Sequence, residues 1–237
     1  MSEAKAVGVR ARVRAELTAE IKQAAKRQLA IDGAPGLSLR AIARELGMAS
    51  SAIYRYFASR EELLTALIVD AYNASAQLVE DADAERDRTD HVGRFVAMSR
   101  ALRWWAIANP NEWALIYGSP VPGYIAPQDT IDPATRIPRA LLTVLFDALP
   151  RDPSPDRSVE TEASDATLDS ALADLLAFTG GAAEPATVAA GVESWAELFG
   201  LISLELYGHF KNAVNDPEVF FDHAVQSMAN RILNVDA

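Results

Sequence analysis

Apolar residues recur along the chain at spacings of three and four, which is the pattern of helices that bury one side. The first such helix is predicted to begin near Thr18 and to end in residues 32–36, which contain glycine and proline. Its apolar side consists of Leu17, Ile21, Ala24, Ala25 and Leu29. Because no alternating β-branched run bounded by hairpin turns occurs, we expect an all-α fold of about nine or ten helices.

Two short helices separated by a tight turn are predicted next. Ser38 is placed to cap the second helix, and Gly47 is placed to end it. The apolar side of this helix consists of Leu39, Ile42, Ala43 and Leu46. Ser50 or Ser51 is placed to cap a third helix that runs through Phe57. This order is typical of a helix-turn-helix, whose second helix lies in the major groove of DNA.

The third helix must bury one edge in its own domain and leave the other edge free for DNA. Ile53 and Phe57, four residues apart, are predicted to supply the buried edge. The outer side then carries Ser50, Ser51, Ala52, Tyr54, Arg55 and Tyr56. We expect this side to reach base edges and phosphates, and we expect Arg40, Arg60 and the arginines of residues 1–14 to contact phosphates.

A long fourth helix is predicted to follow the helix-turn-helix. Residues 59–62, Ser-Arg-Glu-Glu, have the S-x-x-E form of a capping box that opens a helix. An apolar stripe continues from Leu63 to Val79, whereas the charge-rich residues 80–90 have no apolar side. We therefore place a domain boundary within this helix.

Proline and glycine mark the ends of the later helices. A helix over residues 95–108 is predicted to end at Asn109-Pro110, and a short helix over 112–117 to precede a loop at 118–128. An acidic residue directly before proline marks three further helix starts. These are Asp132-Pro133, Glu184-Pro185 and Asp216-Pro217. Residues 150–164 are polar and acidic and are predicted to form an exposed loop.

The charge is divided unevenly along the chain. The total net charge of −11 argues against a protein that binds nucleic acid, because a DNA-binding surface must be basic to neutralise phosphates. Residues 1–60, however, contain 11 Lys and Arg against 5 Asp and Glu, a net charge of +6, which leaves −17 for the rest. The sequence therefore indicates a basic head on an acidic body.

Composition excludes several functions. The chain has no cysteine, so disulfides, thiolate zinc sites and thiol nucleophiles are ruled out. His91, His209 and His223 have no metal-ligand spacing to one another, and no catalytic or phosphate-binding motif occurs. We expect no catalytic residue, metal or cofactor, and an enzyme stays the minor alternative. Without a leader or an apolar span of membrane length, a cytoplasmic location is the default expectation.

The amino-terminal residues resemble the tetracycline-repressor (TetR) family. The likeness extends from Ile21 to Leu64 and includes Leu37-Ser38-Leu39-Arg40-x-Ile42-Ala43-x-x-Leu46-Gly47 and Ala52-Ile53-Tyr54-x-Tyr56-Phe57-x-Ser59-Arg60-Glu61-Glu62. Two residues depart from the family pattern, since Arg60 replaces the more usual lysine and Gln28 replaces an apolar residue.

The resemblance implies a three-helix DNA-binding domain with a basic arm at residues 1–62, and a larger helical ligand-binding and dimerisation domain at 63–237. It also implies a homodimer on a two-fold-symmetric operator. By position, Tyr54 and Arg60 resemble the family's phosphate contacts and Arg40 a contact at the start of the second helix. The residues that resemble its recognition face are Ser50, Ser51, Ala52 and Tyr56.

The carboxy-terminal part resembles a TetR subgroup whose domain contains Trp and Gly (WHG-type). The resemblance rests on residues 195–210, on Asn109-Pro110 and on residues 117–120. A helix over 195–210 is apolar nearly all round and needs burial on two sides. In this family a second subunit covers the extra side, so we expect a homodimer through this helix and the one after Pro217; an intrachain core is the alternative.

Aromatic residues are frequent in the body and are candidates for an apolar ligand pocket, although most aromatics at helical spacing belong to the core. The candidates are Trp104, Trp105, Trp113, Tyr117, Phe146, Phe178, Trp195 and Phe199. We expect a repressor that an apolar or amphipathic small molecule releases from its operator. The alternatives are a ligand-responsive activator, a regulator that needs a co-repressor, and a helical protein that does not bind DNA.

Overall fold

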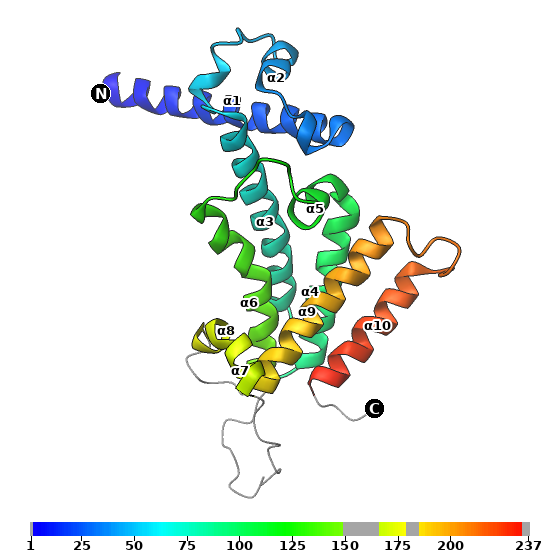
Figure 1. Ribbon diagram of the computed structural model, residues 1–237. Helices are drawn as coiled ribbons and strands as arrows, with labels where there is room; N and C mark the ends of the chain where they lie inside the picture. Colours follow the sequence, from blue (N-terminus) through cyan, green and yellow to red (C-terminus); the bar gives the residue numbers. More distant parts are fainter. Residues whose placement is uncertain (1, 149–165, 179–184, 234–237) are drawn as a thin grey trace, which may run out of the picture. The chain divides into compact units, whose positions relative to one another are not determined.

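The computed structural model describes residues 2–148, 166–178 and 185–233, and all regular structure in these ranges is helical. This confirms the all-α prediction (Figure 1). The α-helices are α1 (Ser2–Asp32), α2 (Leu39–Glu45), α3 (Arg60–Ala84), α4 (His91–Ala108), α5 (Pro110–Tyr117), α6 (Ile131–Ala148), α7 (Ala166–Ala171), α8 (Ala173–Phe178), α9 (Pro185–Leu206) and α10 (Pro217–Ile232). Three short 3-10 helices are η1 (Ala34–Gly36), η2 (Ile53–Arg55) and η3 (Gln128–Thr130). The predicted loop at residues 150–164 lies outside the described residues.

The contacts divide the chain into two compact units. The amino-terminal unit consists of residues 1–74 and 109–134, and the carboxy-terminal unit of residues 75–108 and 135–237. The helix α3 belongs to both, because the division falls after Ala74.

The core of the amino-terminal unit is built by α1, α2, η2 and the first half of α3. Its fully buried side chains include Ile21, Ile42, Ile53, Leu63 and Leu64. A later part of the chain joins this core, since side chains of α5 and the loop after it pack against it. These side chains are Leu115, Ile116, Val121 and Tyr124. Residues 109–134 thereby extend the hydrophobic core of the predicted DNA-binding head.

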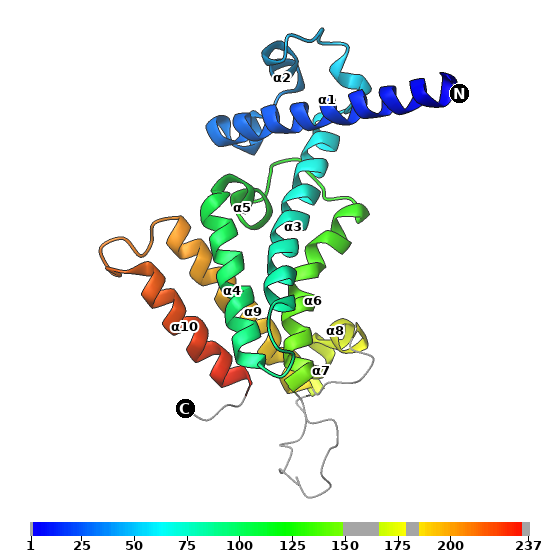
Figure 2. The same ribbon diagram turned by 180° about the vertical axis from the view of Figure 1, so that it is seen from behind.

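The carboxy-terminal unit is organised around α4, α9 and α10, which pack against one another (Figure 2). Their shared core contains Leu102, Leu198, Ile202 and Val225, all almost fully buried. Gly191 brings α9 close to α6, because a Cβ atom there would lie 2.7 Å from Cδ2 of Leu142. Bidentate ion pairs add to this packing, with Arg103 Nη2 2.6 Å from Glu205 Oε1 and Arg100 Nε 2.8 Å from Asp222 Oδ1.

Several helix ends lie where the sequence predicts them. Ser38 Oγ accepts a hydrogen bond from Ala41 N at 3.4 Å. In the capping box, Glu62 N donates to Ser59 Oγ at 3.1 Å and Ala58 N donates to Glu62 Oε2 at 2.6 Å. Asp216 Oδ1 accepts from the first two free N–H groups of α10, each at 3.1 Å. α9 begins at Pro185 as predicted, and α6 begins at Ile131, next to the predicted Asp132.

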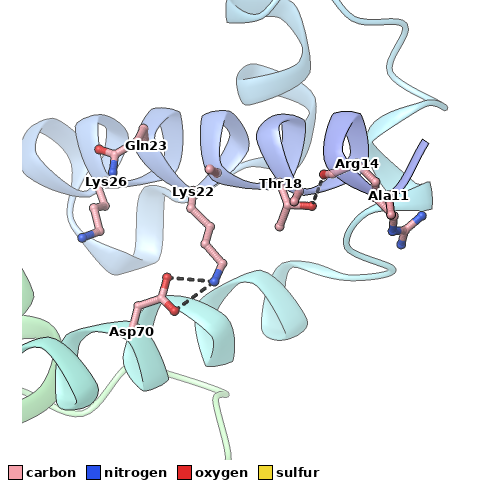
Figure 3. Close-up of a pocket in the computed structure, with 9 residues that line it drawn as sticks. Ala11, Arg14, Thr18, Lys22, Gln23, Lys26 and Asp70 are labelled. Carbon is pink, nitrogen blue, oxygen red and sulfur yellow. Dashed lines mark hydrogen bonds and ion pairs between the residues drawn. The ribbon is translucent and has the colours of Figure 1, made fainter. Parts of the chain in front are cut away.

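The predicted start of the first helix near Thr18 is wrong, because α1 begins at Ser2. The Thr18 hydroxyl donates to the Arg14 carbonyl oxygen at 2.8 Å, so Thr18 lies inside the helix and does not cap it (Figure 3). Residues 2–17 contain no proline and many alanine, arginine and glutamate residues, which favour helix. The helix therefore continues far beyond the part that the core requires.

The predicted third helix is also different. Only η2 is regular, and most of its bonds join residues three apart, with Arg55 N donating to Ala52 O at 3.2 Å and Tyr56 N to Ile53 O at 2.9 Å. One bond joins residues four apart, with Phe57 N donating to Ile53 O at 3.1 Å. Neither Ser50 nor Ser51 caps it, since both lie in the turn before it. Serine has modest helix propensity, because its hydroxyl forms hydrogen bonds with nearby backbone groups that favour a turn. Two consecutive serines therefore favour the turn that precedes η2.

The helix expected over 195–210 ends earlier, at Leu206. Gly208 adopts a φ of 77°, and its N–H bonds to Glu205 O at 3.0 Å while His209 N bonds to Leu204 O at 2.9 Å. This pair of bonds is the Schellman motif that terminates helices at a left-handed glycine. His209 and Phe210 consequently lie outside α9, and His209 is exposed.

Candidate nucleic-acid interface

The helix-turn-helix residues all lie in the amino-terminal unit, between α2 and the start of α3. Ile53 and Phe57 are buried, as predicted for the inner edge, with 0% and 4% of their surface exposed. On the outer side, the exposed residues are Arg40, Ser50, Ser51, Tyr54 and Arg55. Ala52, Tyr56 and Arg60 are partly buried. The segment thus presents hydroxyl groups and guanidinium groups to solvent while two apolar side chains anchor it.

A glycine makes the tight turn between α2 and this segment possible. Gly47 has a φ of 65°, a left-handed conformation that costs other residues free energy. Its N–H donates to Arg44 O at 3.2 Å, and Met48 N donates to Ala43 O at 2.8 Å. These bonds end α2 and redirect the chain toward the outer surface.

Arg60 holds the backbone of its own unit. Its Nε donates to Leu37 O at 3.1 Å and its Nη2 to Ala34 O at 2.6 Å, which ties the start of α3 to the segment before α2. Its Nη1 lies 3.7 Å from Glu61 Oε1. The sequence predicts a phosphate contact for Arg60. It gives no sign of these internal hydrogen bonds, because the two carbonyl oxygens that accept them lie far from Arg60 along the chain.

Arg14, which the sequence offered only as one of several phosphate contacts, also makes contacts within its own unit. Its Nη2 donates to Arg55 O at 2.9 Å, and its guanidinium carbon lies 5.3 Å from the centre of the Tyr56 ring. Arg14 is seven residues before Ile21, two helical turns, and so continues the core side of α1. That spacing predicts a contact between Arg14 and the rest of its unit once α1 is known to begin before Arg14.

Much of the positive charge on the middle of α1 is neutralised within the amino-terminal unit. Figure 3 shows Lys22 reaching from α1 to α3, where its Nζ lies 2.9 and 2.8 Å from the two carboxylate oxygens of Asp70. Lys26 Nζ lies 3.2 Å from Glu112 Oε1. By contrast, Arg40, Arg44 and Arg55 have no ion-pair partner among the residues that the structure describes. Arg27 also pairs with Glu45, and Arg12 pairs with Glu16. Three cations without an ion-pair partner among the described residues therefore lie in or beside the helix-turn-helix.

The aromatic pocket candidates do not form one group. Trp113 and Tyr117 belong to the amino-terminal unit, with ring centres 4.7 Å apart, and Trp113 is fully buried. Burial raises the pKa of the Tyr117 hydroxyl well above its usual range, with a smaller contribution from Tyr72, so it stays neutral. The Tyr72 ring lies 5.8 Å from that of Tyr117.

The other candidates belong to the carboxy-terminal unit. Trp195 and Phe199 are in edge-to-face contact at 5.5 Å, and the buried Trp195 Nε1 has no hydrogen-bond partner within the described part of the chain. Trp104 is 64% exposed, whereas Trp105 is buried. Phe146 is partly buried, and the side chain of Phe178 lies outside the described residues.

The described residues contain neither a metal site nor a membrane-spanning helix. No group of three or more His, Asp or Glu in these ranges is placed to hold a metal ion. None of their helices combines the length and the apolar character needed to cross a membrane.

Comparison with known proteins identifies the family. A family model described as bacterial regulatory proteins, tetR family, matches residues 21–67, and one described as tetracyclin repressor-like, C-terminal domain, matches residues 95–228. The HTH-type transcriptional regulator Mb1846 of Mycobacterium bovis is 41% identical over 219 residues, 91% of this chain and 92% of the relative.

Solved structures agree with this. SCO4313, described as a regulatory protein, is similar with a TM-score of 0.70 and 32% identity, covering 92% of this chain and 97% of its own. The TetR-family regulator PfmR from Thermus thermophilus shares the fold with a TM-score of 0.55 at 16% identity, over 92% of this chain and 99% of its own. This chain belongs to the TetR family of bacterial transcriptional regulators.

Proposed function

We propose that this protein binds operator DNA as a homodimer and represses transcription until a small molecule lowers its affinity for the operator. The observation that carries the proposal is the helix-turn-helix of the amino-terminal unit, where exposed hydroxyl groups lie among arginines without ion-pair partners. TetR proteins are transcriptional regulators and not enzymes, so the enzyme alternative is dropped. We also propose residues 1–62 as the DNA-binding domain, residues 63–237 as the ligand-binding and dimerisation domain, and the cytoplasm as the location.

The DNA contacts are proposed from exposure and chemistry. Arg40, Tyr54 and Arg60 would bind phosphates, which fixes position without reading sequence. The side chains proposed to face the major groove are Ser50, Ser51, Ala52, Arg55 and Tyr56. Serine hydroxyls are short and reach few base edges, so base discrimination would depend mostly on the arginine and the tyrosine.

The homodimer is proposed through α9 and α10, which carry exposed apolar side chains. On α10, Val219 is 64% exposed and Phe220 38% exposed. On α9, Ala196, Gly200 and Leu204 are four residues apart and share one side, and Leu204 is 42% exposed. Small residues at this spacing let a second helix approach closely.

Gly200 offers a direct test of the dimer. A Cβ atom at Gly200 would have no atom within 4 Å, so the single chain has room for a side chain there. Gly200→Leu should therefore leave the fold intact and shift the protein toward monomer in sedimentation velocity. Gly200→Ala, with a small side chain, should shift it less. A dimer of unchanged strength in Gly200→Leu would contradict this interface.

The effector is proposed to be apolar or amphipathic and to bind the carboxy-terminal unit. The pair Trp195 and Phe199 supports this, because the Trp195 indole N–H has no partner among the described residues and could donate to an oxygen or nitrogen acceptor of a ligand. A panel of such compounds should be screened by thermal stabilisation and then by operator affinity. If no compound both stabilises the protein and lowers operator affinity, the release mechanism fails. A compound that raises the affinity would instead identify a co-repressor.

A further inference from the structure

We propose that the amino-terminal turns of α1, residues 10–14, belong to the DNA-reading surface, with Arg14 positioning the recognition segment (Ser50–Tyr56) and Arg10 binding a phosphate beside it. The inference rests on the proposed DNA binding and goes further, because it assigns DNA-related roles to the part of α1 that precedes its core residues.

The recognition segment has few constraints of its own. The helix η2 spans only Ile53–Arg55, and backbone bonds between residues three apart provide most of its regularity. The core anchors Ile53 and Phe57. Tyr56 lies between these anchors and packs against the core, but it is only partly buried, so part of its surface stays outside the core.

Arg14 supplies two contacts that the core does not. The hydrogen bond from its Nη2 to Arg55 O, at 2.9 Å, fixes the backbone directly before Tyr56. Its guanidinium also lies over the Tyr56 ring at 5.3 Å. A planar guanidinium can donate in its plane and stack with its face at the same time, which a lysine ammonium cannot do. Arg14 is therefore a positioning residue for Tyr56.

Arg10 lies one helical turn before Arg14 on the same side of α1. It is exposed and has no acidic partner among the described residues. Arg12, between them in sequence, points to a different side and lies 3.6 Å from Glu16. The side of α1 that meets the recognition segment therefore extends beyond it with one unpaired cation, which is the chemistry that binds a phosphate.

The test uses the full-length protein and the duplex that it selects from a random pool. Affinities are measured for the selected duplex and for a set in which each base pair is changed in turn, at several salt concentrations. The variants are Arg10→Ala, Arg12→Ala, Arg14→Ala, Arg14→Lys and Tyr56→Ala. Circular dichroism melting verifies that each is folded.

Arg10→Ala should weaken all duplexes by a similar factor, about tenfold, and reduce the slope of log K against log salt by about 1. Arg12→Ala removes the same charge from the other side and should have a distinctly smaller effect. Arg14→Ala should change the ranking of the altered duplexes at the base pairs that Tyr56→Ala also affects. Arg14→Lys should keep the salt slope and fail to restore that ranking.

Equal effects of Arg10→Ala and Arg12→Ala would overturn the phosphate role, since the change would then reflect net charge alone. Restoration of the wild-type ranking by Arg14→Lys, or an Arg14→Ala variant that weakens every duplex equally, would overturn the positioning role. Both results presuppose a wild-type protein that selects a duplex. A wild-type protein that selects none would overturn the proposed function itself.

Discussion

The arginines of this chain differ in how many of their N–H groups are bonded inside the protein. Arg60 and Arg94 bond carbonyl oxygens or carboxylates within their own units. Arg40 and Arg55 are exposed and lack acidic partners among the described residues. Internal hydrogen bonds let an arginine contribute to stability, and the N–H groups that they leave unused are available to phosphate.

Arg60 is predicted to affect both stability and DNA binding. Arg60→Ala removes two charge-assisted hydrogen bonds and should lower the free energy of unfolding by about 1–3 kcal/mol, measured by urea denaturation. It should also weaken all duplexes similarly. Arg40→Ala, which has no internal partner to lose, should weaken DNA binding without the loss of stability. Unchanged DNA affinity in Arg60→Ala would refute its phosphate contact.

Tyr54 and Tyr56 are predicted to act differently although they are neighbours. Tyr54 is 44% exposed, and Tyr54→Phe should weaken all duplexes by a similar factor because it removes only a hydroxyl proposed to bind phosphate. Changes at Ser51 or Tyr56 should instead alter the preferred sequence. A Tyr54→Phe variant with a new base preference would contradict this division, as measured by duplex selection.

At the level of elements, the sequence predicted helix ends best where the signal is local. Three such signals are the capping box at Ser59, the turn at Gly47 and the Asp-Pro start at residue 216. Each depends only on residues within one helical turn, so distant packing does not change it. The start of α1 was missed because Thr18 bonds equally well inside a helix. The short form of η2 and the separation of the aromatics depend on distant packing, which local patterns do not record.

The start of α10 permits a quantitative check of a cap. Asp216→Ala removes the acceptor of two backbone N–H groups and should lower the free energy of unfolding by about 1 kcal/mol. Asp216→Asn keeps the acceptor and should cost only a small fraction of this. The comparison is made by urea denaturation at one protein concentration, because the stability of the proposed homodimer would depend on concentration. Equal losses in both variants would indicate a charge effect and not a cap.

Across the whole molecule, a basic amino-terminal region contrasts with an acidic remainder that has its own buried charges. Arg94 is fully buried in the carboxy-terminal unit, with Nε 2.6 Å from Asp83 Oδ1 and Nη1 2.8 Å from Asp147 Oδ2. These bonds join α4 to α3 and α6, and Arg88 pairs with the same two carboxylates. Loss of either partner would leave a buried charge uncompensated.

Asp83 should therefore make folding sensitive to acid. Burial by itself would raise the pKa of its carboxyl, but hydrogen bonds from Arg94 and the charges of Arg94 and Arg88 hold that pKa below its usual value. A lowered pKa contributes stability above the carboxyl's unfolded pKa, near 4, and this stability is lost as the pH falls through the lower folded value.

Asp83→Asn should lower the free energy of unfolding at neutral pH by roughly 3–5 kcal/mol and flatten its decline in acid. Asp81→Asn makes the same charge change at an exposed position of α3 and should do neither. The measurement is urea denaturation at neutral and acidic pH. An Asp83→Asn protein as stable as Asp81→Asn would show that the buried cluster contributes no stability.

The central claim is that the basic amino-terminal unit reads DNA, and selection of duplexes from a random pool by the purified protein, at two salt concentrations, tests it most directly. The account predicts enrichment of a two-fold-symmetric sequence and an affinity that falls steeply as salt rises. No enrichment at either concentration, or binding that is indifferent to salt, would contradict it.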